Sequence, residues 1–209
     1  MTNPVKNMVW KLYPEGNITQ WFGENSDLYA QLGMNGHNGI DIVSPWSTPI
    51  YATSSQKVVE VKSSPTGYGK YVRCVDADRE YTYGHLSKIQ VTLGQQLPEG
   101  IQIGLMGNTG FVVSGATPYW KYNPYTGTHL HYGERMIASC EDGETCIHYL
   151  TGDKTQMVNY NNGFFGAIDP LPRFVIETPE QKIQGLLTVV SLMNQLLSLL
   201  KQLRLLKGR

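Results

Sequence analysis

Short runs of β-branched and aromatic residues, each ended by glycine, proline or asparagine, constrain the fold of this chain most. Between residues 40 and 107 such runs recur at roughly 8–12-residue intervals, the spacing of short antiparallel strands joined by tight turns. The 22 glycines and 13 tyrosines agree, because these residues favour turns and strands respectively. We therefore predict a mainly β fold, an antiparallel sheet core arranged as a sandwich or an open barrel.

The run Gly127-Thr128-His129-Leu130-His131-Tyr132 places two histidines in one predicted strand. Residues i and i+2 of a strand point to the same face, so His129 and His131 should project side by side. Two imidazoles held in this way can bind a metal, or one can bind it while the other moves protons. Two ordinary surface or core histidines are the alternative, unless the rest of the chain supplies partners.

A second candidate pair lies in His37-Asn38-Gly39-Ile40-Asp41. Glycine together with β-branched Ile40 favours a strand over a helix here, so His37, Gly39 and Asp41 should share a face. Gly39 would then leave open space between the imidazole and the carboxylate, as a pair of metal ligands requires. An ordinary His–Asp hydrogen bond is the alternative. His85 ends another predicted strand, and on its own it is more typical of a core residue.

Four motifs follow one another along the chain: His37-x-x-x-Asp41, Tyr83-Gly84-His85-Leu86, Ile103-Gly104-x-x-Gly107-x-Thr109-Gly110 and His129-Leu130-His131. In this order and spacing they resemble the lysostaphin-type (LytM-like) zinc metallopeptidases, which cut peptide bonds in bacterial peptidoglycan. The resemblance covers about residues 17–135 and implies an antiparallel β core with Zn²⁺ in a groove. It also implies that His37, Asp41 and His131 are the zinc ligands and that His85 and His129 are the catalytic histidines.

The chemistry of these residue types agrees with that assignment. A catalytic zinc keeps three protein ligands and an open position for water, whose pKa falls to about 7. The chain has no H-E-x-x-H motif to supply a glutamate base, so another group must move the proton. We predict that His129 accepts the proton of the water and that His85 stabilises the developing oxyanion, with the two roles open to exchange.

The chain departs from the family pattern beside the second zinc histidine. The family commonly has an acidic residue two places after it, where this chain has Gly133. Glu134 follows, but strand alternation predicts that it faces away from the metal. The sequence therefore does not predict a carboxylate that hydrogen-bonds to His131 and supports it as a ligand.

A long insert, residues 111–128, precedes the His-x-His strand and is rich in aromatic residues. We predict that it lines a substrate groove, because loops beside a site commonly carry binding residues. A loop that buries its own rings is the alternative. The candidate substrate-binding residues are Tyr119, Trp120, Tyr122 and Tyr125.

The predicted domain organisation has two parts. Residues 1–176 form the peptidase domain, with the core motifs in 17–135 and an irregular extension over 136–170. Residues 177–209 form a C-terminal amphipathic α-helix for assembly or anchoring, with apolar residues at three- and four-residue spacing through 180–207. The wide apolar face favours self-association in a bundle. Docking onto a partner helix, or membrane contact aided by the basic end Lys201–Arg209, are alternatives, and a spanning helix is disfavoured by the polar residues in 183–200.

Charge and termini bear on partners and location. The 17 basic and 17 acidic side chains balance, so no electrostatic footprint for nucleic acid exists. Residues 1–6 lack an apolar segment, so no cleaved signal peptide is predicted. We expect a phage virion component such as a tail enzyme, or a bacterial protein that reaches the periplasm or exterior by another route. The competing function is a non-hydrolytic module that keeps the fold and only binds the cell wall or builds structure.

The chain has three cysteines. Cys74 lies in a predicted strand and should be a buried thiol. Cys140 and Cys146 flank a turn-like segment, and the sequence leaves open whether they form a disulfide.

Overall fold

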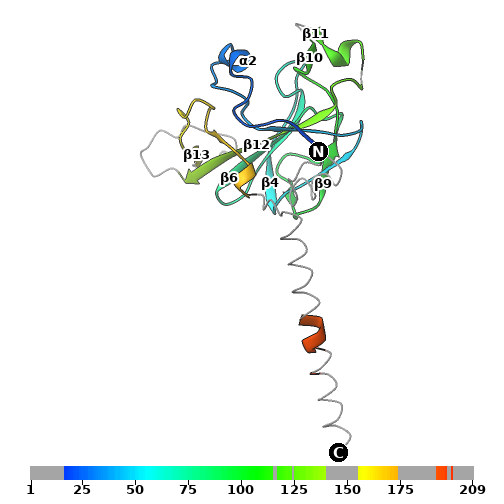
Figure 1. Cartoon of the computed structure of the whole chain (residues 1–209), viewed down its shortest axis with the longest axis vertical. Helices are drawn as coiled ribbons and strands as arrows, with labels where there is room; N and C mark the ends of the chain where they lie inside the picture. Colours follow the sequence, from blue (N-terminus) through cyan, green and yellow to red (C-terminus); the bar gives the residue numbers. More distant parts are fainter. Residues whose placement is uncertain are drawn as a thin grey trace, which may run out of the picture.

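An antiparallel β-sheet organises the structure (Figure 1). The computed structural model describes residues 17–114, 117–123, 125–139, 155–173, 192–196 and 199. Within these residues the main sheet has nine strands in the order β1-β2-β12-β6-β5-β4-β8, with β13 and β14 also paired to β12. The strands of this sheet are β1 Asn17–Gln20, β2 Ile40–Val43, β4 Gln56–Ser63, β5 Lys70–Val75, β6 Arg79–Gly84, β8 Gln96–Leu97, β12 His129–Ser139, β13 Thr155–Met157 and β14 Ala167–Ile168.

Two smaller sheets, three short helices and the helical residues 192–196 make up the other regular structure in the described residues. A three-stranded sheet has the order β3-β9-β7, and a separate hairpin joins β10 to β11. These elements are α2 Ser26–Ala30, β3 Pro49–Tyr51, β7 Lys88–Ile89, β9 Gln102–Leu105, β10 Val113–Ser114, β11 Thr117–Pro118, η1 Tyr119–Lys121 and η2 Leu171–Arg173. The predicted mainly β, antiparallel fold is confirmed.

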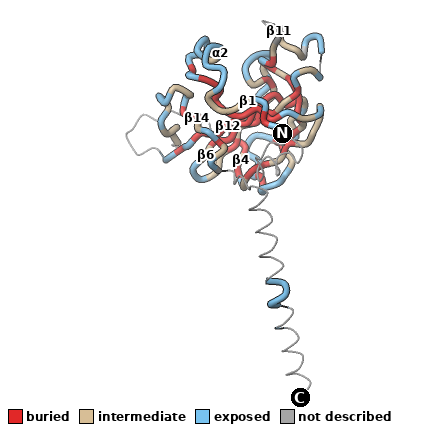
Figure 2. Tube along the Cα trace, viewed as in Figure 1, coloured by how far each residue is buried: buried red, intermediate tan, exposed pale blue. Residues whose placement is uncertain are grey.

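The hydrophobic core lies between the main sheet and the three-stranded sheet, where Figure 2 shows the buried segments together. Tyr83 and Tyr132 of the main sheet are fully buried in one cluster with Ile50 of β3 and Ile103 of β9. The two tyrosine hydroxyls lie 3.0 and 3.3 Å from Thr53 Oγ1, so hydrogen bonds satisfy these buried polar groups. This packing is a two-layer sandwich in which one face of the main sheet is closed.

Strand β12 carries the His-x-His pair on the other face of the main sheet. It pairs with β2 on one side, where His131 lies opposite Asp41, and with β6 on the other side, where His131 lies opposite Gly84. Because His85 follows Gly84 directly, the sheet register alone brings three of the predicted site residues together. The predicted strand around His129 and His131 is confirmed.

The extension beyond residue 135 contains more regular structure than expected. Strand β12 continues to Ser139 and pairs there with β13, while β14 pairs with Glu134 and Arg135. The interpretation of residues 136–170 as irregular is therefore wrong for these strands, which are too short to show a clear alternation pattern. Residues 140–154 lie outside the described part, and so do Cys140 and Cys146; Cys74 is a buried free thiol, as predicted.

The predicted C-terminal helix is described only in part. Residues 192–196 are helical, and the apolar side chains there are well exposed, with Leu192 and Met193 each at 59%. The remainder of residues 180–207 and the division of the chain at residue 176 stay predictions. None of the helices in the described ranges is long and apolar enough to cross a membrane.

Candidate functional site

His37 reaches the site from a loop. Strand β2 begins at Ile40, so the prediction that His37 lies in the strand and shares its face with Asp41 by alternation is wrong. Two backbone hydrogen bonds hold His37 instead: its N–H donates to Glu24 O at 2.8 Å, and its carbonyl accepts from Gly23 N–H at 2.8 Å. Its ring Nδ1–H donates to Trp21 O at 3.2 Å, which leaves the Nε2 lone pair directed into the site.

Three side-chain atoms converge at the start of β2 and β12. His37 Nε2 lies 2.9 Å from His131 Nδ1, and Asp41 Oδ1 lies 3.1 Å from each of these nitrogens. Ligand atoms of a tetrahedral zinc with bonds of about 2.0–2.1 Å are about 3.3 Å apart, so the observed spacing is close to that of three corners of such a site. Among the described residues, these three side chains form a group that could hold a metal ion, because each offers one ligand atom within 4.8 Å of the other two.

The protonation states in the site suit metal binding. Burial lowers the pKa of the His131 imidazole to about 4, against the opposing pull of Asp41. Burial opposes ionisation of Asp41, but the neighbouring His129, His131 and His37 hold the pKa of its carboxyl well below the usual range. Neutral imidazole and ionised carboxylate are the forms that bind zinc, so the residues present fit this ion near neutral pH.

Gly39 makes room for one of these ligands. A Cβ at this position would lie 2.5 Å from Tyr132 O and 2.8 Å from His131 Cε1. The space expected between His37 and Asp41 is therefore filled by the imidazole of His131, which arrives from β12. Glycine at position 39 is required by this close approach.

His85 and His129 lie beside the three converging atoms with matching orientations. Each donates its Nδ1–H to a backbone carbonyl at 2.7 Å, Thr109 O for His85 and Gly127 O for His129. Each neutral ring therefore has an unprotonated Nε2. The two ring centroids are 4.6 Å apart, and His129 Nε2 lies 3.6 Å from Asp41 Oδ2.

The glycine-rich motif before the insert positions His85. Thr109 supplies the carbonyl that accepts from His85, and its Oγ1 donates to Leu86 O at 2.8 Å. His85 itself has a φ of 59°, a left-handed conformation that costs a non-glycine residue about 1–3 kcal/mol. Burial first, and then His129 and His131, lower the pKa of His85 well below 6.5, so the ring stays neutral at pH 7.

The His131 imidazole lacks the acidic partner that is common in the family, in line with Gly133 at that position. Its Nε2 is buried and has no hydrogen-bond partner, and Gly133 lies next to it. The Tyr68 ring packs against the imidazole instead, with centroids 4.8 Å apart, and the Tyr68 hydroxyl accepts a hydrogen bond from Asn38 Nδ2 at 2.7 Å. Glu134 points to the opposite face, as predicted, where Tyr132 OH donates to it at 2.7 Å.

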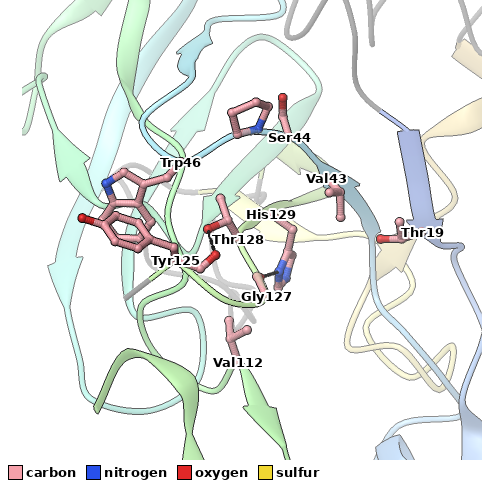
Figure 3. Close-up of a pocket in the computed structure, with 10 residues that line it drawn as sticks. Thr19, Val43, Ser44, Trp46, Val112, Tyr125, Gly127, Thr128 and His129 are labelled. Carbon is pink, nitrogen blue, oxygen red and sulfur yellow. Dashed lines mark hydrogen bonds between the residues drawn. The ribbon is translucent and has the colours of Figure 1, made fainter. Parts of the chain in front are cut away.

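Two cavities adjoin this group of residues. One of about 530 Å³ lies beyond His129 and is lined by Trp46, Tyr125 and Val43 among others (Figure 3). The second, of about 390 Å³, lies over His85 and His131 and extends towards α2. Since His129 and Val112 line both cavities, the two are adjoining parts of one groove, and Asp41 and His131 line its second part.

Of the four aromatic residues predicted to bind substrate, only some lie along this groove. Tyr125 lines the first cavity and is 65% exposed, whereas Tyr119 packs beneath Gly127 and contacts the Tyr122 ring. Tyr119 and Tyr122 are not among the residues lining either cavity, and the side chain of Trp120 lies outside the described part. Substrate binding by the four residues stays a prediction.

Sequence reasoning missed three residues of the groove: Tyr29, Trp46 and Tyr68. Tyr29 comes from α2, its ring lies 5.4 Å from that of His37, and burial followed by Asp41 raises the pKa of its hydroxyl, which stays protonated. Trp46 follows β2 in a turn and contacts Tyr125 edge to face at 5.4 Å. The position of Trp46 directly after the strand that carries Asp41 was a usable signal. Nothing local marked Tyr29, because the folding of the 21–36 loop brings it to the site.

This geometry can be compared with known proteins. The family model of Peptidase family M23 matches residues 35–142, just over half of the 209-residue chain and the segment that contains all five site residues. The chain belongs to peptidase family M23. The predicted resemblance to lysostaphin-type peptidases is thereby confirmed.

Two curated relatives illustrate the extent of the M23 similarity. The peptidoglycan DD-endopeptidase ShyA of Vibrio cholerae is 40% identical over 97 residues, which cover 46% of this chain and 19% of the relative. Lysostaphin of Staphylococcus simulans is 35% identical over 128 residues, which cover 57% of this chain and 23% of the relative. The chain therefore spans only about a fifth to a quarter of the length of these two relatives.

Solved M23 structures show the same fold. The catalytic domain of lysostaphin from Staphylococcus simulans superposes with a TM-score of 0.53 at 23% identity, over 80% of this chain and 96% of that domain. LytU superposes with a TM-score of 0.50 at 25% identity, over 76% of this chain and 83% of LytU. The antiparallel core described above is therefore the M23 fold.

Proposed function

We propose that this M23 member is a zinc-dependent endopeptidase that hydrolyses peptide bonds in bacterial peptidoglycan. The observation that carries the proposal is the convergence of His37 Nε2, Asp41 Oδ1 and His131 Nδ1 within 3.1 Å, at the floor of a groove. The names of two relatives, a peptidoglycan DD-endopeptidase and a glycyl-glycine endopeptidase, support the substrate class.

His37, Asp41 and His131 would hold the zinc, leaving an open side towards His85 and His129. When bound, zinc lowers the pKa of a water to about 7 and polarises the scissile carbonyl. We propose that His129 accepts the proton of the attacking water at Nε2 and returns it to the leaving amine. Its Nδ1–H bond to Gly127 O orients the ring for this exchange, and its Nε2 lies 3.6 Å from Asp41 Oδ2.

His85 has the same tautomer as His129 but is more deeply buried. Neutral His85 accepts a hydrogen bond at Nε2, and it can donate to an oxyanion only after that nitrogen is protonated. Because its pKa is lowered by burial, the accepting role is its resting state. We propose that His85 orients the water and supports the oxyanion once a proton has been shared between the two rings.

The test is clearing of purified peptidoglycan by the full-length protein, with and without a chelator. We expect clearing that chelator abolishes and added zinc restores, with analysis of the released fragments naming the bond. Clearing that persists after the metal has been removed would contradict the zinc-dependent mechanism. No clearing of any cell-wall type by the zinc-loaded protein would favour the non-hydrolytic module.

The location of the protein is a separate proposal. Placement in a phage virion, or in the periplasm or exterior of a bacterium, is proposed from the sequence alone. Detection of the protein in purified phage particles, by mass spectrometry, would test the first of these.

A further inference from the structure

Exposed apolar side chains line both rims of the cavity that extends towards α2. On one rim, Leu28 in α2 is 45% exposed and Leu32, just after it, is 53% exposed. On the other rim, Phe111 is 45% exposed, whereas Val113 is half-buried and Val112 is buried beneath them. Helix α2 buries none of its own residues, so its leucine is not there to fill the core. Clustered apolar surface of this kind marks a binding site.

Hydrogen bonds hold both rims in place. Behind α2, Met34 N–H donates to Tyr29 O at 3.0 Å and Asn35 N–H donates to Gly163 O at 2.8 Å. At the opposite rim, Phe111 N–H donates to Gly67 O at 2.8 Å. These bonds keep the apolar side chains apart across the cavity. The cavity of about 390 Å³ is thus preformed, and its size is within the range of about 300–1,000 Å³ of ligand sites.

The charges in this cavity are confined to the catalytic group. The lining residues include Asp41 and three histidines, but no lysine, arginine or glutamate. The lining residues from 28–34 and 111–113 are aliphatic and aromatic, and Gln20 and Asn38 add uncharged polar groups. A charged substrate side chain placed there would lose its water without gaining a partner, which is unfavourable. A glycine would leave the apolar surface uncovered.

We propose that this cavity, here named the apolar subsite, binds an uncharged apolar side chain of a substrate residue next to the scissile bond. Leu28, Leu32 and Phe111 contact that side chain and select it over glycine and over charged residues. The inference rests on the proposed endopeptidase function. Among peptidoglycan peptides, it favours bonds flanked by alanine-type residues over all-glycine bridges.

The first experiment varies the substrate. Two series of quenched fluorescent peptides carry Gly, Ala, Leu, Lys or Glu, either just before or just after the scissile bond. In one of the two series, we expect kcat/KM of the zinc-loaded full-length protein to be at least about tenfold higher for Leu than for Gly, with Ala also above Gly and with Lys and Glu lowest. If Gly or a charged residue gives the highest kcat/KM in both series, the apolar subsite is overturned.

A binding measurement separates the subsite from the catalytic proposal. The same peptides are titrated calorimetrically into the zinc-loaded His129→Ala protein, which reports binding without turnover. We expect the Leu peptide to bind more tightly than the Gly peptide. Equal affinities overturn the apolar subsite whether or not the wild-type protein cleaves, whereas tighter Leu binding without any cleavage contradicts only the endopeptidase.

Variants assign the preference to the named residues. Leu28→Ser combined with Phe111→Ser should reduce the Leu/Gly ratio in both kcat/KM and affinity to near one. Leu93→Ser is the matched control, because Leu93 is 69% exposed and does not line the cavity, and it should keep the full ratio. All three side chains are exposed, so thermal melting should show folded protein in each case. An unchanged ratio in the folded double variant would overturn the assignment.

Discussion

At the residue scale, the candidate metal centre depends on a position without a side chain. A Cβ at Gly39 would collide with the Tyr132 carbonyl at 2.5 Å and with the His131 ring at 2.8 Å. We expect Gly39→Ala to displace His131 and to lower zinc affinity about 10–100-fold, measured by competition with a chromogenic chelator. Gly133→Ala is the comparison, since its Cβ would lie 3.4 Å from His131 Nε2, and it should cost less. Equal losses of zinc affinity in the two variants would contradict the role of Gly39 in admitting the His131 ring.

His131 and His129 should respond differently to removal, although they share one face of β12. His131→Ala removes one of three converging donor atoms, so both bound zinc and hydrolysis should be lost. His129→Ala should keep zinc, because its Nε2 is not among those donors, but should lower kcat about 10²–10⁴-fold. Zinc content by atomic emission and peptide hydrolysis check the two variants. A His129→Ala protein that fails to retain zinc would show that the roles are assigned wrongly.

The thiol of Cys74 should be unreactive in the folded protein. Burial, and then Glu80, raise the pKa of Cys74 from 9.0 to about 12, so the thiolate that reacts is scarce at pH 8. In a Cys140→Ser/Cys146→Ser protein, a thiol reagent should label Cys74 only after denaturation. The pKa is higher in the folded state, so the stabilising contribution of this group is present below pH 9 and is lost as pH rises from 9 towards 12. Rapid labelling of native protein at pH 8 would contradict the burial.

At the scale of elements, β12 and β6 are joined by a buried ion pair on the site face of the sheet. Arg135 and Glu80 lie opposite each other in register, and Arg135 Nη1 donates to Glu80 Oε1 at 2.6 Å. Arg73 Nε also lies 3.7 Å from Glu80 Oε1. Arg135→Met therefore removes the closer of two cations from a buried carboxylate, and it should destabilise the fold by up to about 3–5 kcal/mol in urea unfolding. Adding Glu80→Gln should recover part of this loss. A single variant as stable as the wild type would show that the pair is dispensable.

The same strand explains how one element serves both core and site. Leu130, Tyr132 and Glu134 point to one face, where Arg79 Nη1 also donates to Glu134 at 3.2 Å. His129 and His131 point to the other face. The only carboxylate close in sequence to His131 is therefore used to satisfy Tyr132 within the main sheet. Packing with Tyr68 takes the place of an acidic partner for the imidazole.

At the scale of the whole molecule, the predicted C-terminal helix (the tail, residues 177–209) exposes apolar side chains in its described residues. In the described part of the helix, the exposed fractions are 58% for Leu196 and 62% for Leu199. If the tail self-associates, Leu196→Ser with Leu199→Ser should lower the molar mass found by analytical ultracentrifugation at micromolar protein. Leu93→Ser should leave the mass unchanged. The same mass for the wild type and the tail variant would contradict self-association through these residues.

The sequence by itself determined the fold class and the family, and it predicted the five candidate site residues that the structure brings together. Alternation of apolar residues and the spacing of turns are local properties, so short strands could be predicted, and His129 and His131 follow from a strand period of two. The order of the four motifs supplied the remaining partners His37, Asp41 and His85.

The tertiary structure alone decided how these residues meet. The loop before β2 brings His37 and Tyr29 into place through backbone hydrogen bonds that link residues distant from the strand pattern. Gly39 leaves room for the ring of His131 on β12, although the two residues are 92 positions apart in the sequence. No local pattern predicts such a contact. The apolar subsite likewise joins α2 to residues 111–113, because long-range packing, unlike strand alternation, depends on which segments the completed sheet places side by side.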